Sequence, residues 1–433
     1  MNFAFTDDQL ALAATVRDVL AAHCPPRAVR TERTPAWSRL AEIGLFGLMV
    51  PEEYEGLGLG LVDAVPALEE TGRAALPGPV AETVAAAPAL LAGNPLLGEL
   101  AKGSLRVSTI VGDQVYAPDA DLADLLIVER DGVPYAVSPD RVRLTPQPGV
   151  DRTRRLFGVD LGTVNPRTVD PGAEDGAEAG SGGASRPEAR GVTRLTVPTE
   201  GVVRPPVPGG GVVRPPVLGG GLVRLPVRTA PAVRAVTVAV AAQLVGLARH
   251  LLDASVAHAL TRRQFGVPIG SFQAVKHLLA DVAVAVEFTA PLVCAAAVAV
   301  DRDLPSAGRD VAAAKAGAGE TAELAARAAL QVHGAMGYTE EFDLHLWLAR
   351  VWSLSAAHGG TALHRSRLRA MILGRCSCEG PSHGSGEGSC EGPDRRFGEG
   401  PGRRFGEGSD EGPGGRFGEG PREGTGEGIG GSR

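Results

Sequence analysis

Hydrophobic positions in the first hundred residues follow the period of an amphipathic helix. Apolar residues at 6–22 recur every three or four positions, Thr6 is the expected N-cap, and acidic residues occupy the first turn. A second helix is predicted at 36–49, and a third follows a loop marked by Pro51 and several glycines. The pattern predicts an N-terminal helical domain over 1–104.

Between 105 and 160 the pattern changes to short, β-branched runs divided by turn residues. The sequence RDGVPYAV at 130–137 predicts a β-hairpin with Asp-Gly at its turn. We therefore expect a small middle β domain over 105–230, which also contains a low-complexity insert at about 162–229.

The insert ends in four consecutive decapeptides that span 191–230. Their arginines are in register with a period of ten, at Arg194, Arg204, Arg214 and Arg224. Stacked coils of a β-solenoid would explain such a repeat, but proline at alternate strand positions argues against them. The favoured interpretation is an expanded, mostly disordered linker beside one true strand.

Long segments rich in Ala, Leu and Val follow, at 231–262, 272–301, 305–333 and 341–372. Long helices joined by short loops are typical of an antiparallel four-helix bundle, which we assign to 231–374. The predicted fold class is mostly α, with a small middle β domain between an N-terminal helical domain and a C-terminal four-helix bundle.

Composition and charge narrow the possible partners. A net charge of -7 indicates no basic surface, so no nucleic-acid partner is expected. The longest apolar stretch, 278–300, contains Asp281 and Glu287, which favours a buried bundle helix over a membrane span. The N-terminus carries acids where a signal peptide would carry basic and then apolar residues, so a cytoplasmic location is expected.

The Gly-rich segment 375–433 repeats RRFGEGP-like units and has almost no aliphatic residues, so it is expected to be disordered. It contains Cys376, Cys378, His383 and Cys390. Their spacing matches no closed zinc pattern, and no metal site is predicted. The two remaining cysteines, Cys24 and Cys294, lie in predicted helices and are expected to be buried thiols.

Three stretches carry a more specific signal. They are TRRQFGVPIGSFQAVKHLLAD at 261–281, QVHGAMGYTEEFDLHLWLAR at 331–350 and WSRLAEIGLFGLMVPEEYEGLGLG at 37–60. Together they resemble the acyl-CoA dehydrogenase family, over roughly 1–160 and 231–372. The resemblance implies FAD as cofactor, α,β-dehydrogenation of an acyl-CoA thioester, and electron-transfer flavoprotein as the electron acceptor.

The resemblance also implies residues that bind FAD. In the RxxFG motif, Arg262 matches an arginine that binds the FAD pyrophosphate of a neighbouring subunit, which suits a doubly anionic group. Phe265 matches a residue that packs beside the cofactor, and Gln273 matches one that hydrogen-bonds it. The alternative for Arg262 is a solvated helix end. Residues that reach a second protomer's flavin imply a homo- or hetero-oligomer, with a related acyl-CoA dehydrogenase subunit in the second case.

A second motif and a threonine complete the implied cofactor contacts. Gln331, Gly334 and Ala335 match a QxxGG turn that lets the backbone approach FAD, with alanine in place of the second glycine. Thr361, which follows HGG, matches a threonine that contacts the flavin nucleotide. The alternative for Gly334 is a plain helix C-cap.

The family's catalytic base has no counterpart at either of its known positions. Most members carry a glutamate in YEGT, but this chain reads HGGT, so Gly359 occupies that position. Other members carry the base on the first bundle helix, where this chain has Val236. His358 is the nearest titratable side chain, with an ordinary helix-face histidine as the alternative. A family strand resembling TEPxAGSD is also missing from 101–125.

This combination resembles one branch of the family, actinobacterial heteromers that act on steroid side-chain thioesters. In these, one subunit has lost the base and completes the cofactor site, while the other subunit carries the base. Three hypotheses remain open: a subunit that works with a base-bearing partner, a self-sufficient dehydrogenase with an unrecognised base, and a non-catalytic scaffold or regulatory paralogue.

Overall fold

The computed structural model describes residues 5–162, 166–167, 222–340 and 342–374. All of these lie within one compact unit, Met1–Cys378. The predictions made for the interior of the decapeptide insert, and for the tail with its cysteines, fall outside the described residues.

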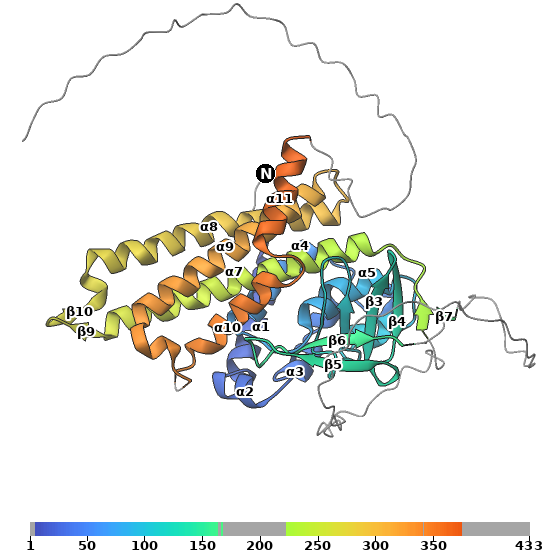
Figure 1. The fold of residues 1–433 in the computed structure, drawn as a ribbon, viewed down its shortest axis with the longest axis horizontal. Coiled ribbons are helices and arrows are strands. Elements are labelled where there is room, and N and C mark those ends of the chain that lie inside the picture. The colour runs from blue at the N-terminus through green and yellow to red at the C-terminus, as the bar shows by residue number, and fades with distance from the viewer. Residues whose placement is uncertain (1–4, 163–165, 168–221, 341, 375–433) are drawn as a thin grey trace, which may run out of the picture. The chain divides into compact units, whose positions relative to one another are not determined.

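Short helices build the N-terminal part of the chain (Figure 1). They are α1 Asp7–His23, α2 Pro26–Thr31, α3 Trp37–Glu42, η1 Leu45–Gly47, η2 Glu52–Tyr54, α4 Leu61–Arg73, the π-helical turn η3 Glu82–Ala86, α5 Ala87–Leu90 and α6 Leu96–Ala101. Thr6 caps α1 as predicted, because its side chain accepts from the Gln9 N–H while the Gln9 side chain accepts from the Thr6 N–H. The helix predicted at 36–49 is shorter than expected, since Gly44 adopts a φ of +78° and redirects the chain after α3.

The middle domain contains two small sheets. Its elements are β1 Val107–Ile110, β2 Ala117–Pro118, β3 Leu125–Arg130, β4 Val133–Val137, η4 Pro139–Arg141, β5 Arg143–Gln147, β6 Leu156–Asp160, β7 Pro166–Arg167 and β8 Leu222–Arg224. One sheet has the order β1-β3-β4-β8-β7 and the other β2-β6-β5. The pairs β1–β3 and β7–β8 are parallel, and the other pairs within these two sheets are antiparallel.

The predicted Asp-Gly hairpin joins β3 to β4. Asp131 and Gly132 have φ values of +52° and +76°, and Arg130 pairs with Val133 across the two-residue loop. Both central residues at positive φ are typical of the tight hairpin turn that matches strand twist. The prediction is confirmed.

The last decapeptide supplies β8. Its Arg224 pairs opposite Tyr135 of β4, and the Leu225 N–H donates to the Pro134 carbonyl at 2.9 Å. Leu222 is fully buried and joins the small core between the two sheets. One unit of the repeat is therefore an integral part of the domain.

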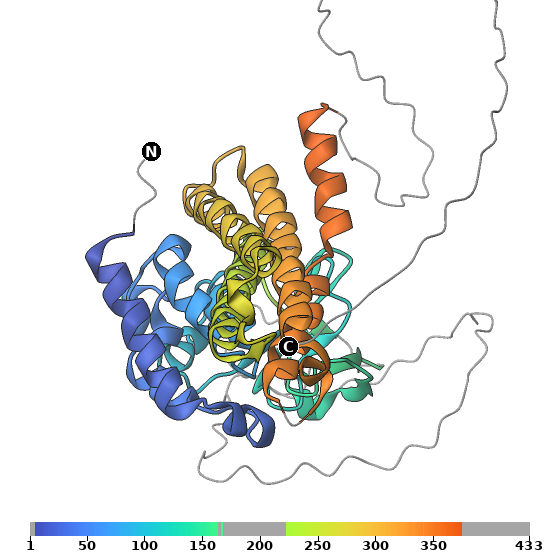
Figure 2. The same cartoon turned by 90° about the vertical axis from the view of Figure 1, so that its left-hand side faces the viewer.

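The C-terminal part is a helical bundle. Its elements are α7 Thr229–Thr261, β9 Arg263–Gln264, β10 Val267–Pro268, η5 Ile269–Ser271, α8 Gln273–Asp301, α9 Ala307–His333, η6 Gly334–Tyr338, α10 Leu344–Ala356 and α11 Thr361–Ile372. Figure 2 shows α7, α8 and α9 side by side, with the N-terminal helices on one flank and α11 on the other. The fourth predicted segment, 341–372, is two helices, because His358 and Gly359 have φ values of +51° and +95°, outside the helical region.

Helix α7 is the central element, and it packs against α4, η3, α8 and α9. Where it crosses α4, Gly72 and Gly246 let the two backbones touch. A Cβ at Gly246 would overlap the Glu69 carbonyl oxygen, and one at Gly72 would overlap the Gln243 carbonyl oxygen. Only glycine permits this approach. The N-terminal helices and the bundle therefore share one continuous core.

Two helices, α7 and α8, are long and apolar enough to cross a membrane by length and composition. Inside the structure, 78% of the most apolar stretch of α7 is buried, and 50% of that of α8. Core helices have the same composition, so packing accounts for α7. The other half of α8 forms an exposed apolar face.

Candidate functional site

A β-hairpin lies at the end of the bundle where α7 leads into α8 (Figure 1). Arg262 is the C-cap of α7, and Phe265 lies in the hairpin turn with a φ of +52° and 92% of its surface exposed. The Phe265 ring meets the Phe272 ring edge-on, with centroids 6.2 Å apart. A non-glycine residue at positive φ is uncommon and makes Phe265 a candidate functional position.

The end of α9 lies against the end of α7. The His333 ring is 4.3 Å from the His258 ring on α7 and 5.2 Å from the Phe342 ring. Burial lowers the pKa of both histidines, which favours their neutral forms at neutral pH. Gly334 then ends α9 at a φ of +61°, with no atom near the position of a Cβ. Gly334 is thus a helix C-cap, and the space beside its backbone is open to a ligand.

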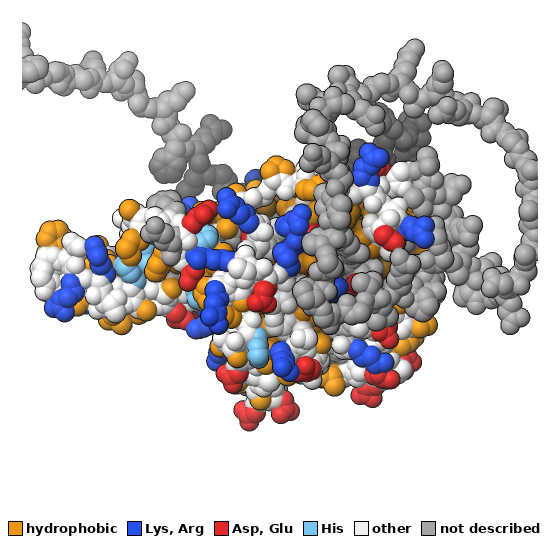
Figure 3. Space-filling view, turned by 90° about the horizontal axis from the view of Figure 1, so that it is seen from below, with side chains coloured by type: hydrophobic (Ala, Val, Ile, Leu, Met, Phe, Trp, Pro, Cys, Tyr) orange, Lys and Arg blue, Asp and Glu red, His pale blue; other side chains and the backbone are white. Residues whose placement is uncertain are grey.

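The structure brings six of the seven predicted cofactor residues to this end of the bundle, and all six are exposed: Arg262, Phe265, Gln273, Gln331, Gly334 and Ala335. The Arg262 guanidinium forms no hydrogen bond or ion pair within the part of the chain that the structure describes. The Gln273 amide has only a 3.4 Å contact with His277. Figure 3 shows exposed basic and hydrophobic side chains together at this end. A guanidinium without a partner among the described residues, set beside exposed amides, suits an anionic ligand.

The seventh predicted residue, Thr361, lies apart from these six, at the start of α11. Before it, the chain turns through His358 and Gly359, and Gly360 is the N-cap of α11. The Thr361 Oγ1 is buried and has no hydrogen-bond partner among the described residues. A buried hydroxyl without a partner is expected to bind water or a ligand.

Neither predicted base position carries an acid, and the backbone at Gly359 is adapted to glycine. Its φ is +95°, and a Cβ there would lie 2.9 Å from Nε2 of His364 and 3.1 Å from Cδ2 of Leu363. Val236 is fully buried within α7. A residue with a carboxylate at position 359 would therefore carry backbone strain and crowd the ring of His364.

A buried cluster of charged groups faces this turn. Glu82, at the start of η3, has its Oε1 3.6 Å from Nε2 of His358 and 3.7 Å from Nη2 of Arg154. Their exposed fractions are only 3%, 2% and 6%, respectively. Burial alone would raise the pKa of Glu82, but His358 and Arg154 outweigh it and hold the pKa below its ordinary value. Glu82 is therefore a buried carboxylate that stays ionised at neutral pH.

Glu82 and Arg154 were not identified from the sequence. Glu82 is the only acid in the apolar run 79–91, and a lone charge in such a run signals a buried, paired group. Arg154 lies in a polar loop among other arginines and gives no comparable signal. Their association with His358 depends on tertiary structure alone.

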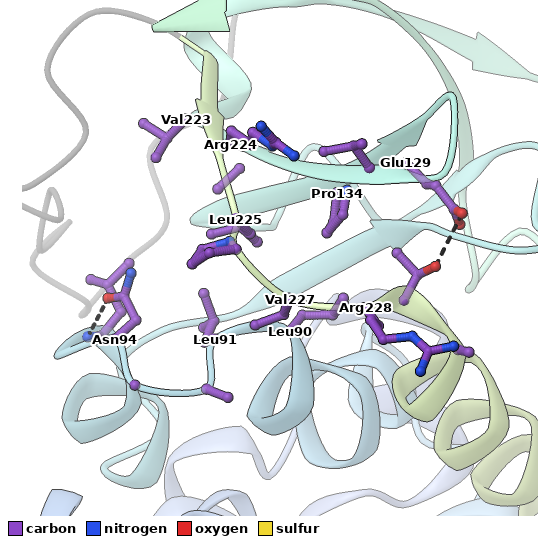
Figure 4. Close-up of a pocket in the computed structure, with 18 of the residues that line it drawn as sticks. Leu90, Leu91, Asn94, Glu129, Pro134, Val223, Arg224, Leu225, Val227 and Arg228 are labelled. Atoms are coloured by element: carbon purple, nitrogen blue, oxygen red, sulfur yellow. Dashed lines mark hydrogen bonds between the residues drawn. The ribbon is translucent and has the colours of Figure 1, made fainter. Parts of the chain in front are cut away.

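A cavity of about 1020 Å³ lies away from both places, between the end of α5 and strand β8. Figure 4 shows residues of its lining, which include Leu90, Leu91, Asn94, Val223, Arg224 and Leu225. In its wall, Glu129 accepts a hydrogen bond from Thr229 at 3.0 Å. None of the predicted site residues lines this cavity, so its size alone does not assign it to the reaction.

The exposed face of α8 carries large apolar side chains. Val284, Phe288 and Leu292 follow at one-turn intervals and are 54%, 76% and 43% exposed. Beside them, Val256 and Leu260 of α7 line an apolar groove of about 470 Å³ between the two helices. This apolar face is a candidate interaction surface, and it ends next to the hairpin that carries Arg262.

Two family models match the chain. The model of the acyl-CoA dehydrogenase N-terminal domain matches residues 6–97, and that of the acyl-CoA dehydrogenase C-terminal domain matches residues 236–373. The β domain and its insert lie between these two matches.

Individual relatives agree with this result. The acyl-CoA dehydrogenase IpdE2 of Mycobacterium tuberculosis is 29% identical over 372 residues, which cover 83% of this chain and 94% of that protein. Among solved structures, a variant of the Tcur3481-Tcur3483 steroid ACAD matches with a TM-score of 0.66 and 22% identity, over 85% of this chain and 98% of that chain. The ChsE4-ChsE5 complex from M. tuberculosis matches with a TM-score of 0.65 and 21% identity, over 88% and 100%. The two solved structures establish the similarity of fold.

Proposed function

The chain belongs to the acyl-CoA dehydrogenase family of FAD-dependent oxidoreductases, and we propose that it acts as a subunit that lacks the family's catalytic glutamate. In the reaction, a base removes the α-proton of an acyl-CoA thioester while the β-hydrogen leaves as hydride. A related subunit that retains the glutamate supplies the base. The observation that carries this proposal is the α10–α11 turn, which contains no acid and is built around Gly359.

The chemistry explains why this position is decisive. An α-proton of a thioester is weakly acidic, so the base must be a carboxylate that is desolvated and held in place. Gly359 cannot accept a proton, and its backbone conformation disfavours any other residue. Val236, at the other known base position, is equally unable to do so. The chain has therefore lost proton abstraction at both of the family's positions.

The described residues fit FAD in two separate groups. We assign the FAD pyrophosphate of a neighbouring protomer to Arg262, whose guanidinium is exposed and has no partner in the described part of the chain, with Gln273 and Gln331 as amide donors. We assign contact with the chain's own flavin to the hydroxyl of Thr361, which has no hydrogen-bond partner within the described ranges. FAD accepts the hydride when it is bound. The role of these residues would therefore be to hold the cofactor in place.

A second subunit follows from the location of the first group. Arg262 and Phe265 lie at an exposed end of the bundle, continuous with the apolar face of α8. One of the solved structures with this fold is a complex of two chains, ChsE4 and ChsE5. We propose a hetero-oligomer that buries this face, located in the cytoplasm, with electron-transfer flavoprotein as the electron acceptor.

One observation favours a second candidate, a self-sufficient dehydrogenase. Glu82 is an ionised carboxylate 3.6 Å from Nε2 of His358, the residue next to Gly359. Neither ring nitrogen of His358 has a hydrogen-bond partner among the described residues, so a proton carried on Nε2 toward Glu82 would leave Nδ1 as a proton acceptor. The Glu82–His358 pair would then be the base that the family's usual positions lack.

Purification of the chain alone and together with a related chain that carries the glutamate tests the proposal. The visible spectrum reports bound FAD, and reduction of a dye by an acyl-CoA reports turnover. We expect the isolated chain to be inactive and the co-purified pair to be yellow and active. Replacement of the partner's glutamate by glutamine should abolish activity without removing the flavin.

Other outcomes separate the alternatives. An isolated chain that is yellow and active overturns the proposal and favours the second candidate, provided that His358→Asn removes the activity. A chain that binds no FAD alone or in the pair leaves only a non-catalytic role.

A further inference from the structure

The α10–α11 turn is held by side chains from three parts of the fold. The backbone N–H of His358 donates to Oε1 of Gln114 at 2.9 Å, and the His358 carbonyl accepts from Nε2 of His364 at 2.9 Å. His358 is a non-glycine residue at a φ of +51°, a conformation that costs about 1–2 kcal/mol. Such a turn persists only where its surroundings hold it.

Lys315 of α9 also holds the turn, through two hydrogen bonds from its Nζ. Its Nζ donates to the Ser355 carbonyl at 3.0 Å and to the Gly359 carbonyl at 3.1 Å, so one side chain holds both sides of the turn. Lys315 is fully buried. Burying an amine is costly unless it makes hydrogen bonds, and here its bonds go to the backbone rather than to a carboxylate. Lys315 therefore acts on the shape of the turn.

Gly319 lies one helical turn after Lys315, on the same face of α9. A Cβ at this position would lie 2.5 Å from Oγ1 of Thr361. Gly317, two residues earlier, faces α8 instead, where a Cβ would make an ordinary 3.5 Å contact with Leu292. The space at Gly319 is thus specific to the Thr361 hydroxyl.

We infer that Lys315 and Gly319 are positioning residues, which together set the direction of the Thr361 hydroxyl. Lys315 fixes the turn that precedes Thr361, the first residue of α11. Gly319, which has no side chain, leaves space for the Thr361 hydroxyl. Threonine has few allowed χ1 rotamers. A side chain at position 319 would therefore force Thr361 into another rotamer, because a small shift of the hydroxyl within the same rotamer would not relieve the overlap. The inference rests on the proposed contact between Thr361 and the flavin.

Four variants of the full chain, purified with its partner subunit, test this inference. Lys315→Met keeps the length of the side chain but removes both donors, and Lys102→Met is its control, since Lys102 is exposed. Gly319→Ala is matched by Gly317→Ala, because both gain the same helix propensity. The measurements are retained FAD, the absorption spectrum of the bound flavin, and amide hydrogen exchange of residues 358–361 in the FAD-free chain.

We expect Lys315→Met and Gly319→Ala to retain FAD about tenfold more weakly, as for one lost hydrogen bond, and to shift the flavin spectrum. Lys315→Met should also speed exchange in the turn without FAD. In a Thr361→Ala background, Gly319→Ala should cause no further loss. Unchanged spectra and exchange in both variants, or equal effects of Gly317→Ala and Gly319→Ala, would overturn the inference. If the wild-type chain bound no FAD, either alone or together with its partner subunit, that result would refute the proposed function instead of this inference.

Discussion

Restoring the family's glutamate by the single substitution Gly359→Glu should destabilise the protein, because the backbone and the neighbouring side chains at position 359 suit glycine. Position 359 has a φ of +95°, and a Cβ there would lie 2.9 Å from the ring of His364. The adjacent Gly360 has a φ of -75°, and no atom lies within 4 Å of its Cβ position. Gly360→Glu therefore introduces the same charge one residue away without either conflict, and is the matched control.

The expected cost of Gly359→Glu has two parts. A left-handed conformation costs a residue with a side chain about 1–2 kcal/mol, and crowding a packed site costs about 1–3 kcal/mol. We therefore expect Gly359→Glu to be about 2–5 kcal/mol less stable than Gly360→Glu. Gly360 is the N-cap of α11, where a carboxylate also interacts favourably with the helix dipole.

Thermal unfolding of the two variants measures this difference, which should appear as a fall in Tm of roughly 3–8 °C for a folded unit of this size. A cycle with His364→Ala separates the two parts, because removing the ring relieves the crowding but not the backbone strain. Equal stability of Gly359→Glu and Gly360→Glu would refute the steric argument. Acyl-CoA turnover by the isolated Gly359→Glu chain would show that the turn accommodates the base.

Three further predictions follow from individual side chains. Arg262→Met should weaken FAD retention in the paired protein by at least tenfold with little change in Tm, because its guanidinium has no partner in the described chain. The neighbouring Arg263→Met is the control, and an equal loss of FAD in both variants would contradict the assignment. Glu82→Gln should destabilise the fold by about 3–5 kcal/mol in denaturant titrations at pH 7, since it leaves buried Arg154 unmatched. The folded pKa of Glu82 is lowered, so the wild type should lose this stability as pH falls below about 4.3 and through the folded pKa. Burial, followed by Arg154, lowers the pKa of Lys315 from 10.5 to about 7, so stability should decrease by roughly 4–5 kcal/mol as pH falls across that interval. Lys315→Met should remove this dependence, and a profile identical to that of the wild type would contradict it.

Local signals in the sequence predicted much of the fold. The N-cap at Thr6 and the Asp131-Gly132 turn depend on residues a few positions apart, and both are confirmed. The break between α10 and α11 was missed although HGG stands at that point, because the helical period continues on both sides of it. Its cause is the positive φ of His358, which is imposed by partners from distant parts of the chain.

The candidate site was less accessible to sequence reasoning for the same physical reason. The sequence motifs predict Arg262 and its neighbours as cofactor-binding residues, and these exposed positions need no long-range partner. Glu82 and Lys315 act through contacts with residues far along the chain, and their burial depends on the packed core. The motif alone predicts that Gly359 occupies the family's base position, whereas the positive φ of Gly359 could not be predicted from it.

The strand β8 has a consequence for the repeat from which it comes. The fifth residue of its decapeptide, Leu225, donates its backbone N–H to Pro134 in β4. The corresponding residues of the second and third decapeptides are Pro205 and Pro215, which have no N–H to donate, and only the first decapeptide, with Leu195, retains one. The proline-bearing copies are therefore poor competitors for the place beside β4. A gene could gain or lose such copies, and so lengthen or shorten the insert by tens of residues, while the same last unit continues to complete the sheet.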